Sequence, residues 1–195
     1  MLYIATSLDG KIASSDGSIG WLDSITVDCG TNEWMKSIGT VLMGRTTYEQ
    51  VSSFPGEYPY KQQKNYIFST TKGSFKHGIA VNPSNLNEFV HQIKSEASDE
   101  SNEKDIWLIG GGKLIENFII LDLIDEYIIT IIPIILGDGV PMFTSSILDS
   151  YKRYFPSKSE EKSLNQYFQL KESKTFDESL IMLTYERLRT PTVSH

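Results

Sequence analysis

Short apolar runs alternate with stretches of helical periodicity along the first two thirds of the chain. Four runs rich in β-branched and aromatic residues predict buried strands: Leu2–Thr6, Thr40–Met43, Asn65–Ser69 and Asp105–Ile109. Apolar residues three or four positions apart predict helices between and after these strands: Thr31–Ile38, Thr46–Val51, Asn85–Ala97 and Gly112–Leu121. Strands separated by helices form right-handed βαβ crossovers, so the pattern predicts a mainly parallel sheet flanked by helices.

The last third of the chain follows another pattern. Three further strands are predicted: Glu126–Ile132, Tyr167–Lys174 and Leu180–Arg187. The last two have no long helix between them, and the residues at 175–179 are typical of a hairpin connection. We therefore expect an α/β fold with a mixed, mainly parallel sheet whose C-terminal strands are antiparallel.

Two polar segments interrupt this pattern. Residues 94–105 carry seven charges in twelve positions and predict a solvated helix end and loop. Residues 151–163 are charged, contain Pro156 and predict a surface loop with room for a helical turn. Neither segment reads as a linker between domains, so we expect a single domain over residues 1–190 and a short tail over 191–195.

The net charge of the chain limits the classes of partner that it can bind. Of 195 residues, 18 are Lys or Arg and 25 are Asp or Glu, which gives a formal charge of −7. An acidic protein is a poor ligand for nucleic acid or anionic lipid, because both bind basic surfaces. A small phosphorylated ligand needs only two or three local cations, and the composition allows one.

Other residue types narrow the class of protein further. A single cysteine, Cys29, excludes an intrachain disulfide framework and is expected to be inert. The three histidines show no metal-ligand spacing, so no metal site is predicted. Asp9 comes too early for a signal peptide, and acidic residues interrupt the apolar tract at 118–136. We expect a cytoplasmic protein without a membrane span.

A glycine triplet ends one of the predicted strands. Gly110, Gly111 and Gly112 are followed by Lys113 and a predicted helix. Glycines at such a junction let a phosphate approach the unpaired N–H groups of the helix N-terminus. The spacing matches neither the dinucleotide fingerprint of a Rossmann domain nor a Walker loop. The alternative is a plain tight turn between strand and helix.

A second strand also runs through a glycine into a helix. Arg45 follows Gly44 and is placed to reach an anion held at the helix end. Thr46 or Thr47 can cap this helix, with Glu49 at capping-box distance from Thr46. The alternative is an ordinary capped helix with a surface arginine.

A third strand ends in hydroxyl groups. Ser69, Thr70 and Thr71 precede Lys72, a set that suits a phosphate monoester such as the 2′-phosphate of NADPH. Hydroxyl-rich strand ends are also common in ordinary loops. Because ligands of open α/β sheets bind at the carboxyl ends of the strands, the three strand ends together predict a polyanionic cofactor.

Several motifs occur in an order that resembles a known family. They are Ile4–Ala13 (IATSLDGKIA), Gly20-Trp21, Met43–Glu49 (MGRTTYE), Ile109–Gly112 (IGGG), Leu123–Glu126, Ile132–Gly139 and Pro141–Phe143. Over residues 2–187 the chain resembles the dihydrofolate reductase superfamily, most closely the branch similar to the C-terminal reductase domain of bacterial riboflavin biosynthesis. The resemblance implies a dihydrofolate reductase-like fold that binds NADPH and transfers hydride to a small heterocyclic or carbonyl substrate.

The resemblance also implies roles for individual residues. Ala5 and Ile12 are expected to contact the nicotinamide carboxamide through their backbones, and Trp21 to end a mobile loop over the nicotinamide. A larger set is expected to hold the adenosine side and the phosphates: Gly44, Arg45, Thr46, Thr47, Ser69, Thr70, Lys72, Gly111, Gly112, Lys113 and Leu114.

Two departures from the family pattern bear on the substrate. Riboflavin-pathway reductases carry a substrate-binding glutamate just before the paired glycines, where this chain has Ile109 and Gly110. Dihydrofolate reductases carry a carboxylate after the tryptophan, and Asp28 lies at about the matching distance. Asp28 is therefore the candidate catalytic acid, with a bound water as the alternative proton donor, whereas Asp9 is expected to be a turn residue.

Three alternatives stay open at this point: a true dihydrofolate reductase, a riboflavin-pathway reductase, and a non-catalytic module that binds the nucleotide for sensing or assembly. The resemblance and the apolar strand at residues 127–136 also suggest a homodimer.

Overall fold

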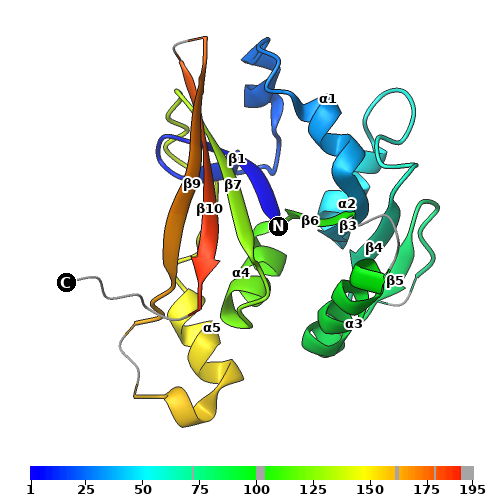
Figure 1. The fold of residues 1–195 in the computed structure, drawn as a ribbon, viewed down its shortest axis with the longest axis vertical. Helices are drawn as coiled ribbons and strands as arrows, with labels where there is room; N and C mark the ends of the chain where they lie inside the picture. The colour runs from blue at the N-terminus through cyan, green and yellow to red at the C-terminus, as the bar shows by residue number, and fades with distance from the viewer. Residues whose placement is uncertain (72, 100–103, 161–162, 178, 190–195) are drawn as a thin grey trace. The chain divides into compact units, whose positions relative to one another are not determined.

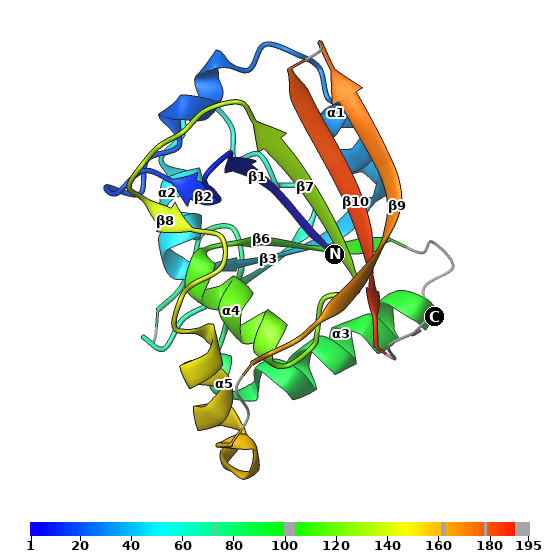
Figure 2. The ribbon, with the colours of Figure 1, turned by 90° about the vertical axis from the view of Figure 1, so that its left-hand side faces the viewer.

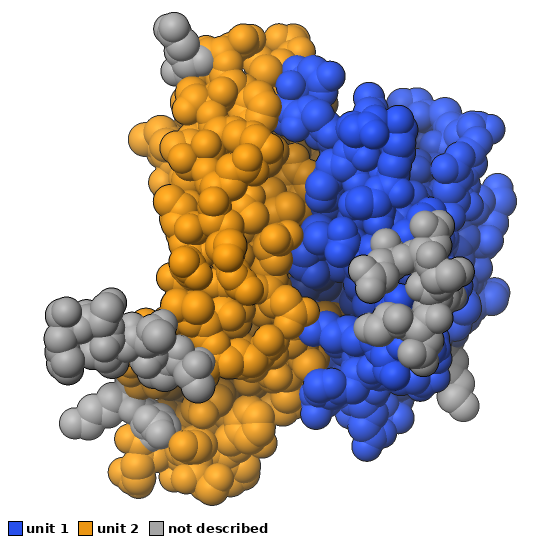
Figure 3. Space-filling model, in the orientation of Figure 1, with its two compact units in different colours: residues 1, 28–114 blue, residues 2–27, 115–195 orange. Residues whose placement is uncertain are grey.

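The chain divides into two compact units, which Figure 3 shows in different colours. The structure, a computed structural model, describes residues 1–71, 73–99, 104–160, 163–177 and 179–189. Unit 1 comprises Met1 and residues 28–114, and unit 2 comprises residues 2–27 and 115–195. The predicted tail at 191–195 lies outside the described residues, and the single-domain boundary stays a prediction.

Unit 1 is built on parallel strands in the spatial order β5-β4-β3-β6 (Figure 1). The strands are β3 (Ile38–Gly44), β4 (Lys64–Phe68), β5 (Ile79–Val81) and β6 (Asp105–Gly110). Its helices are α1 (Thr31–Trp34), α2 (Arg45–Ser52) and α3 (Leu86–Asp99), with 3₁₀ turns at Met35–Ser37 and Pro83–Asn85. Helix α4 (Gly112–Ile120) begins in unit 1 and continues into unit 2.

Alternating side chains of β4 cover both faces of this sheet. Tyr66 and Phe68 pack edge-on against Phe89 of α3. On the other face, the buried Asn65 accepts a hydrogen bond of 2.8 Å from the hydroxyl of Tyr58. The central strand β3 is buried on both faces, as expected for a parallel strand between two neighbours.

The helix predicted over Thr31–Ile38 is only partly correct. The α-helix stops at Trp34, a 3₁₀ turn follows, and Ile38 is the first residue of β3. Ile38 pairs with Asp105 of β6 and is 2% exposed. Its burial therefore comes from the sheet, although its spacing from Trp34 had predicted a helix.

Unit 2 contains the strand order β1-β7-β10-β9. Its strands are β1 (Leu2–Ser7), β7 (Glu126–Ile132), β9 (Tyr167–Phe176) and β10 (Leu180–Leu188). Strands β1 and β7 are parallel, whereas β10 runs antiparallel to both β7 and β9. A separate small sheet pairs β2 (Lys11–Ala13) with β8 (Val140–Pro141). The predicted α/β class, mainly parallel with antiparallel C-terminal strands, is confirmed.

The surface segment predicted over residues 151–163, with room for a helical turn, contains the last turn of helix α5 (Ile147–Tyr154) and a 3₁₀ turn at Pro156–Lys158 (Figure 2). The helix begins four residues before the predicted segment. Helical spacing places Ile147 and Tyr151 on one side of α5, and Ser150 is buried, so an amphipathic helix forms before the proline. Residues 161–162 lie outside the described part. Within the described ranges, no helix combines the length and apolarity needed to span a bilayer.

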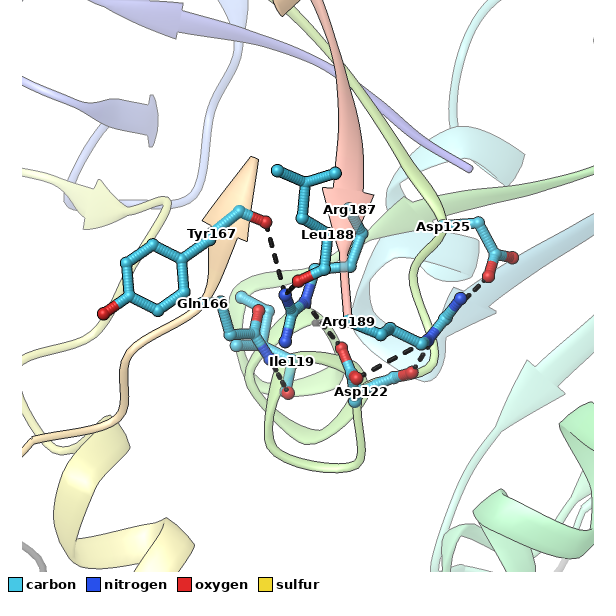
Figure 4. Close-up of polar contacts among 8 residues, drawn as sticks. All are labelled: Ile119, Asp122, Asp125, Gln166, Tyr167, Arg187, Leu188 and Arg189. Carbon is cyan, nitrogen blue, oxygen red and sulfur yellow. Dashed lines mark hydrogen bonds and ion pairs between the residues drawn. The ribbon is translucent and has the colours of Figure 1, made fainter. Parts of the chain in front are cut away.

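An ion-pair network joins the C-terminal hairpin to the turn after α4 (Figure 4). The Arg187 side chain, 9% exposed, donates through Nε to Asp122 Oδ1 at 2.8 Å and through Nη1 to the carbonyls of Tyr167 and Leu188. Arg189 reaches Asp125 at 2.7 Å but is 51% exposed. Burial makes the Arg187 contacts the stronger anchor of the hairpin.

Replacing Arg187 with methionine is expected to lower the free energy of unfolding by about 2 kcal/mol, because Asp122 and two carbonyl groups lose a shielded donor. The matched variant Arg189→Met should lower it by less than about 1 kcal/mol, since an exposed ion pair contributes little. Urea denaturation of the two variants measures the difference. Equal losses of stability would contradict the ranking.

Candidate functional site

Two strand–helix junctions lie side by side in unit 1. Strands β3 and β6 are parallel neighbours, and Met43 pairs with Gly110, so both strands end at the same level. Helix α2 begins at Arg45 and α4 at Gly112, directly after those ends. The carboxyl ends of two strands and the N-termini of two helices therefore meet at one edge of the sheet.

The two junctions lie close together. A Cβ atom on Gly44 would lie 3.8 Å from both Gly110 O and Gly111 N, and one on Gly111 would lie 3.3 Å from Thr47 Oγ1. Gly110 has φ of 129°, which side chains disfavour, and the Gly110–Gly111 peptide bond is cis. The two junctions place four glycines near one another, a set that we call the glycine cradle: Gly44, Gly110, Gly111 and Gly112.

The expected cap of α2 is wrong. Gly44, in extended conformation, is the N-cap, and no side chain caps this end. Because α2 begins one residue earlier than predicted, Thr46 and Thr47 lie inside its first turn. Glu49 forms no capping box; it accepts a hydrogen bond of 2.7 Å from Arg45 Nε. The first N–H groups of α2 are consequently left without a side-chain cap, as an anion site requires.

The α4 side of the cradle holds the other predicted residues. Leu114 N donates to Gly111 O at 2.9 Å and closes the first turn of the helix. Leu114 is buried, so it anchors α4, whereas Lys113 is exposed. The structure therefore brings Gly44, Thr47 and Gly111 together, with the exposed side chains of Arg45 and Lys113 on the first turns of the two helices.

The hydroxyl-rich end of β4 forms a compact turn. Ser69 Oγ donates to Thr71 O at 2.9 Å and accepts from Thr71 N at 3.1 Å, and Ser69 N donates to Val81 O. Thr70 is exposed between them. Lys72 lies outside the described residues. Strand β4 is the other neighbour of β3, so this turn follows the next strand along the same sheet.

Three predicted residues, those assigned to the nicotinamide, belong to unit 2. Ala5 lies on β1 opposite Thr130 of β7, Ile12 lies on β2, and Trp21 lies in the 3₁₀ helix Gly20–Ser24. Thr130 is 5% exposed, and its hydroxyl has no hydrogen-bond partner within the described residues. Sequence reasoning missed Thr130, because a single threonine in an apolar strand carries no signal of its own.

Asp9 ties two loops of unit 2 together, in the turn that the sequence predicts. Its carboxylate accepts hydrogen bonds from Ser7 Oγ at 2.7 Å, Gly137 N at 2.9 Å and Leu136 N at 3.1 Å. The bond from Ser7, followed by those from the backbone amides, lowers the pKa of the Asp9 carboxyl below its ordinary value. Asp9 thereby holds the loop before Ile12 in place.

Asp28, the candidate catalytic acid, precedes α1 in unit 1. Its side chain is exposed, and Oδ1 accepts a hydrogen bond of 2.8 Å from Gly30 N. This is a local Asx-type turn at the start of a helix. Its role as a proton donor stays a prediction. Within the described ranges, no cluster of three His, Cys, Asp or Glu side chains could hold a metal.

Comparison with known proteins identifies the family. Residues 1–182 match the family described as the RibD C-terminal domain. The chain belongs to this family. YwjB of Bacillus subtilis (strain 168), an uncharacterized protein, is 39% identical over 147 residues, which cover 73% of this chain and 81% of YwjB. YyaP of the same organism, also uncharacterized, is 31% identical over 154 residues, or 73% of this chain and 79% of YyaP.

Solved structures agree with this assignment. A putative riboflavin biosynthesis protein from Shewanella sp. PV-4 superposes with a TM-score of 0.74 at 30% identity, covering 96% of this chain and 98% of that one. The Thermotoga maritima deaminase and 5-amino-6-(5-phosphoribosylamino)uracil reductase superposes with a TM-score of 0.64 at 16% identity, covering 96% of this chain and 56% of that longer protein. The RibD-type, dihydrofolate reductase-like fold is confirmed.

Proposed function

We propose that this RibD-type domain is an NADPH-dependent reductase that transfers hydride to a small heterocyclic or carbonyl substrate. The observation that carries the proposal is the glycine cradle, where the N-termini of α2 and α4 follow the ends of two neighbouring strands. Such an arrangement suits a pyrophosphate, because N–H groups and two helix dipoles face the same anion.

The residues present fit that group. A Cβ on Gly111 would crowd Thr47 and narrow the cradle, so the bare backbone keeps room for phosphate oxygens. Thr46 and Thr47 add hydroxyl donors, and Arg45 and Lys113 add positive charge against the net charge of −7. For the 2′-phosphate we propose Ser69, Thr70 and Lys72. For the nicotinamide carboxamide we propose the backbones of Ala5 and Ile12, with Trp21 closing over the ring.

The cofactor supplies the hydride from C4 of its reduced nicotinamide when bound. The chain would contribute orientation of the reacting atoms and exclusion of water. We propose that the buried hydroxyl of Thr130 offers a polar contact beside Ala5. Asp28 or a bound water would deliver the proton that the reduced product requires.

Two observations bear on the substrate class: the family of the chain, and the lack of a glutamate before its paired glycines. The T. maritima relative is named as a uracil reductase, which supports a nitrogen heterocycle as the substrate. The stretch before the paired glycines consists of Ile109, which is half-buried, and Gly110, so it offers no carboxylate to a ribosylaminopyrimidine. We therefore propose a heterocycle or carbonyl compound that needs no acidic contact at this position. A dihydrofolate reductase and a non-catalytic NADP-binding module remain the alternatives.

The ion pair between Arg45 and Glu49 makes the cofactor assignment testable. Arg45→Ala should raise the Kd for NADPH about tenfold, because a charge-assisted phosphate contact is lost. Glu49→Gln should lower this Kd by about threefold, since Arg45 is released from a competing carboxylate.

Lys72→Ala should bring the affinities for NADPH and NADH closer together. Fluorescence titration measures all three changes.

The ion pair between Lys61 and Glu57 provides the matched control, because it has the same spacing of four residues and is also exposed. Lys61→Ala should leave the Kd for NADPH unchanged. Equal effects of Arg45→Ala and Lys61→Ala would refute the assignment of Arg45.

Catalysis is tested by following oxidation of NADPH with a panel of acceptors: dihydrofolate, deaminated ribosylaminopyrimidine and small carbonyl compounds. We expect turnover with at least one class, and transfer of deuterium from C4-labelled NADPH to the product. Tight binding of NADPH without oxidation by any member of the panel would favour the non-catalytic module.

A further inference from the structure

Helix α4 carries a buried carboxyl group that the reaction described above does not use. Glu116 lies on the second turn of this helix and is 2% exposed. Its neighbours Ile115 and Phe118 on the same helix are buried as well. A carboxylate in such surroundings is costly unless hydrogen-bond donors compensate it, so the donors that it meets indicate what it holds in place.

One donor comes from the segment between β8 and α5. The hydroxyl of Thr144 donates a hydrogen bond to Glu116 Oε2, and Ser146 Oγ donates to Thr144 Oγ1 at 3.3 Å. Thr144 is partly buried, whereas Ser146 is exposed. Figure 2 shows this segment running from β8 past α4 to α5. Glu116 therefore holds the chain just beyond Pro141, the last residue of β8.

Strand β8 depends on such an anchor because the sheet that it forms with β2 is small. The two strands pair at two positions, with a register shift between them. The residue after β8, Met142, donates its N–H to Gly10 O at 2.9 Å. Two strands of this length have little stability by themselves, so contacts with the surrounding structure must fix their place.

The loop that leads into β8 has an anchor of another kind. Asp9 holds this loop through hydrogen bonds from Leu136 N and Gly137 N, but Asp9 is exposed. Water can take over hydrogen bonds at an exposed carboxylate, whereas it does not reach a buried one. The bond between Thr144 and Glu116 is consequently the anchor of β8 that solvent cannot replace.

We propose that Glu116 and Thr144 are positioning residues for hydride transfer. Through β8 they fix β2, and β2 presents the backbone of Ile12 to the nicotinamide carboxamide. The inference rests on the proposed function, which assigns that contact to Ile12. All members of this series of contacts, from Glu116 through Thr144 and β8 to β2, belong to unit 2.

The proposal separates two parts of cofactor binding. The glycine cradle and Arg45, which are assigned to the phosphates, belong to unit 1. The contacts of Glu116 act instead on the strand assigned to the nicotinamide. Loss of the Thr144 hydroxyl should therefore affect the rate of hydride transfer more than the affinity for NADPH, because a small displacement of the reacting ring costs rate.

Thr144→Val tests this expectation, since valine keeps the branched shape and removes the hydroxyl donor. Its kcat should fall about tenfold, while its Kd for NADPH should change by less than about twofold. Thr144→Ser keeps the hydroxyl and should restore most of kcat. The double variant Glu116→Leu/Thr144→Val should be no slower than Thr144→Val, because it also removes the buried carboxylate that has lost its donor.

Gln166→Met is the matched control. Gln166 Nε2 also tethers α4, through a hydrogen bond of 2.8 Å to Ile119 O near the end of the helix. This variant should keep kcat within about twofold of the wild type, because the tether does not run to β8. Equal losses of kcat in Gln166→Met and Thr144→Val would show that general loosening of α4 sets the rate, and would overturn the proposal.

Hydrogen exchange of the Met142 amide, measured without cofactor, tests the link to β2 independently of activity. Thr144→Val should speed this exchange about tenfold, because the bond to Gly10 opens when β8 loosens. Gln166→Met should leave the exchange rate unchanged. Circular dichroism establishes that each variant is folded.

The outcomes separate this inference from the proposed function. A wild type that does not bind NADPH would refute both, because Ile12 would lose its assigned role. A wild type that binds NADPH, with a Thr144→Val variant that keeps either its kcat or its Met142 exchange rate, would refute this inference alone. If NADPH binds without turnover, the fluorescence of the bound nicotinamide replaces kcat as the measure, and Thr144→Val should alter it while Gln166→Met does not.

Discussion

The structure of unit 1 depends on the close approach of two backbones, those of the β3–α2 and β6–α4 junctions. A Cβ on Gly44 would lie 3.8 Å from Gly111 N, and a Cβ on Gly111 would lie 3.3 Å from Thr47 Oγ1. The register that pairs Met43 with Gly110 fixes both strand ends at one level, and the two helices then start together. The N–H donors and helix dipoles that we propose for the site depend on that arrangement.

Local charge decides what an acidic protein can bind. The exposed Arg45 and Lys113 stand on the first turns of the helices that begin at the cradle, while Glu49 holds Arg45 through an ion pair. In unit 2, by contrast, Arg187 and Arg189 are committed to Asp122 and Asp125 and stabilise the hairpin. We propose that Arg45 serves a ligand, whereas Arg187 and Arg189 serve the fold through their ion pairs.

The spacing of apolar residues in the sequence correctly predicted the elements whose side chains are buried in the structure. The range Glu126–Ile132 matches β7 residue by residue, because an apolar strand between two neighbours has few other ways to bury its side chains. The short strands β2 and β8 were missed, since two or three residues carry no period. Their pairing depends on Gly139, where a Cβ would lie 2.3 Å from Ala13 O. The sequence shows that glycine only as part of a turn.

The sequence predicted which residues make up the candidate site, but not which residue caps helix α2. Gly44, Arg45 and the glycine triplet stand out because glycine before a helix has a known use, and the structure brings Gly44 and Gly111 together. Whether Thr46 or Gly44 caps α2 depends on the residue at which strand β3 ends. Helix propensity does not determine that residue. The hydroxyl of Thr130 became visible only when the packing of β7 beside β1 showed it buried without a partner among the described residues.

The central claim is that the glycine cradle binds the pyrophosphate of NADPH. Backbone amide NMR of the isotope-labelled chain during titration with NADPH tests it most directly, because the cradle binds through N–H groups. The amide signals of Gly44, Gly111 and Gly112 should move with the same saturation as the nicotinamide fluorescence. Saturable binding of NADPH that leaves these three signals in place would contradict the account.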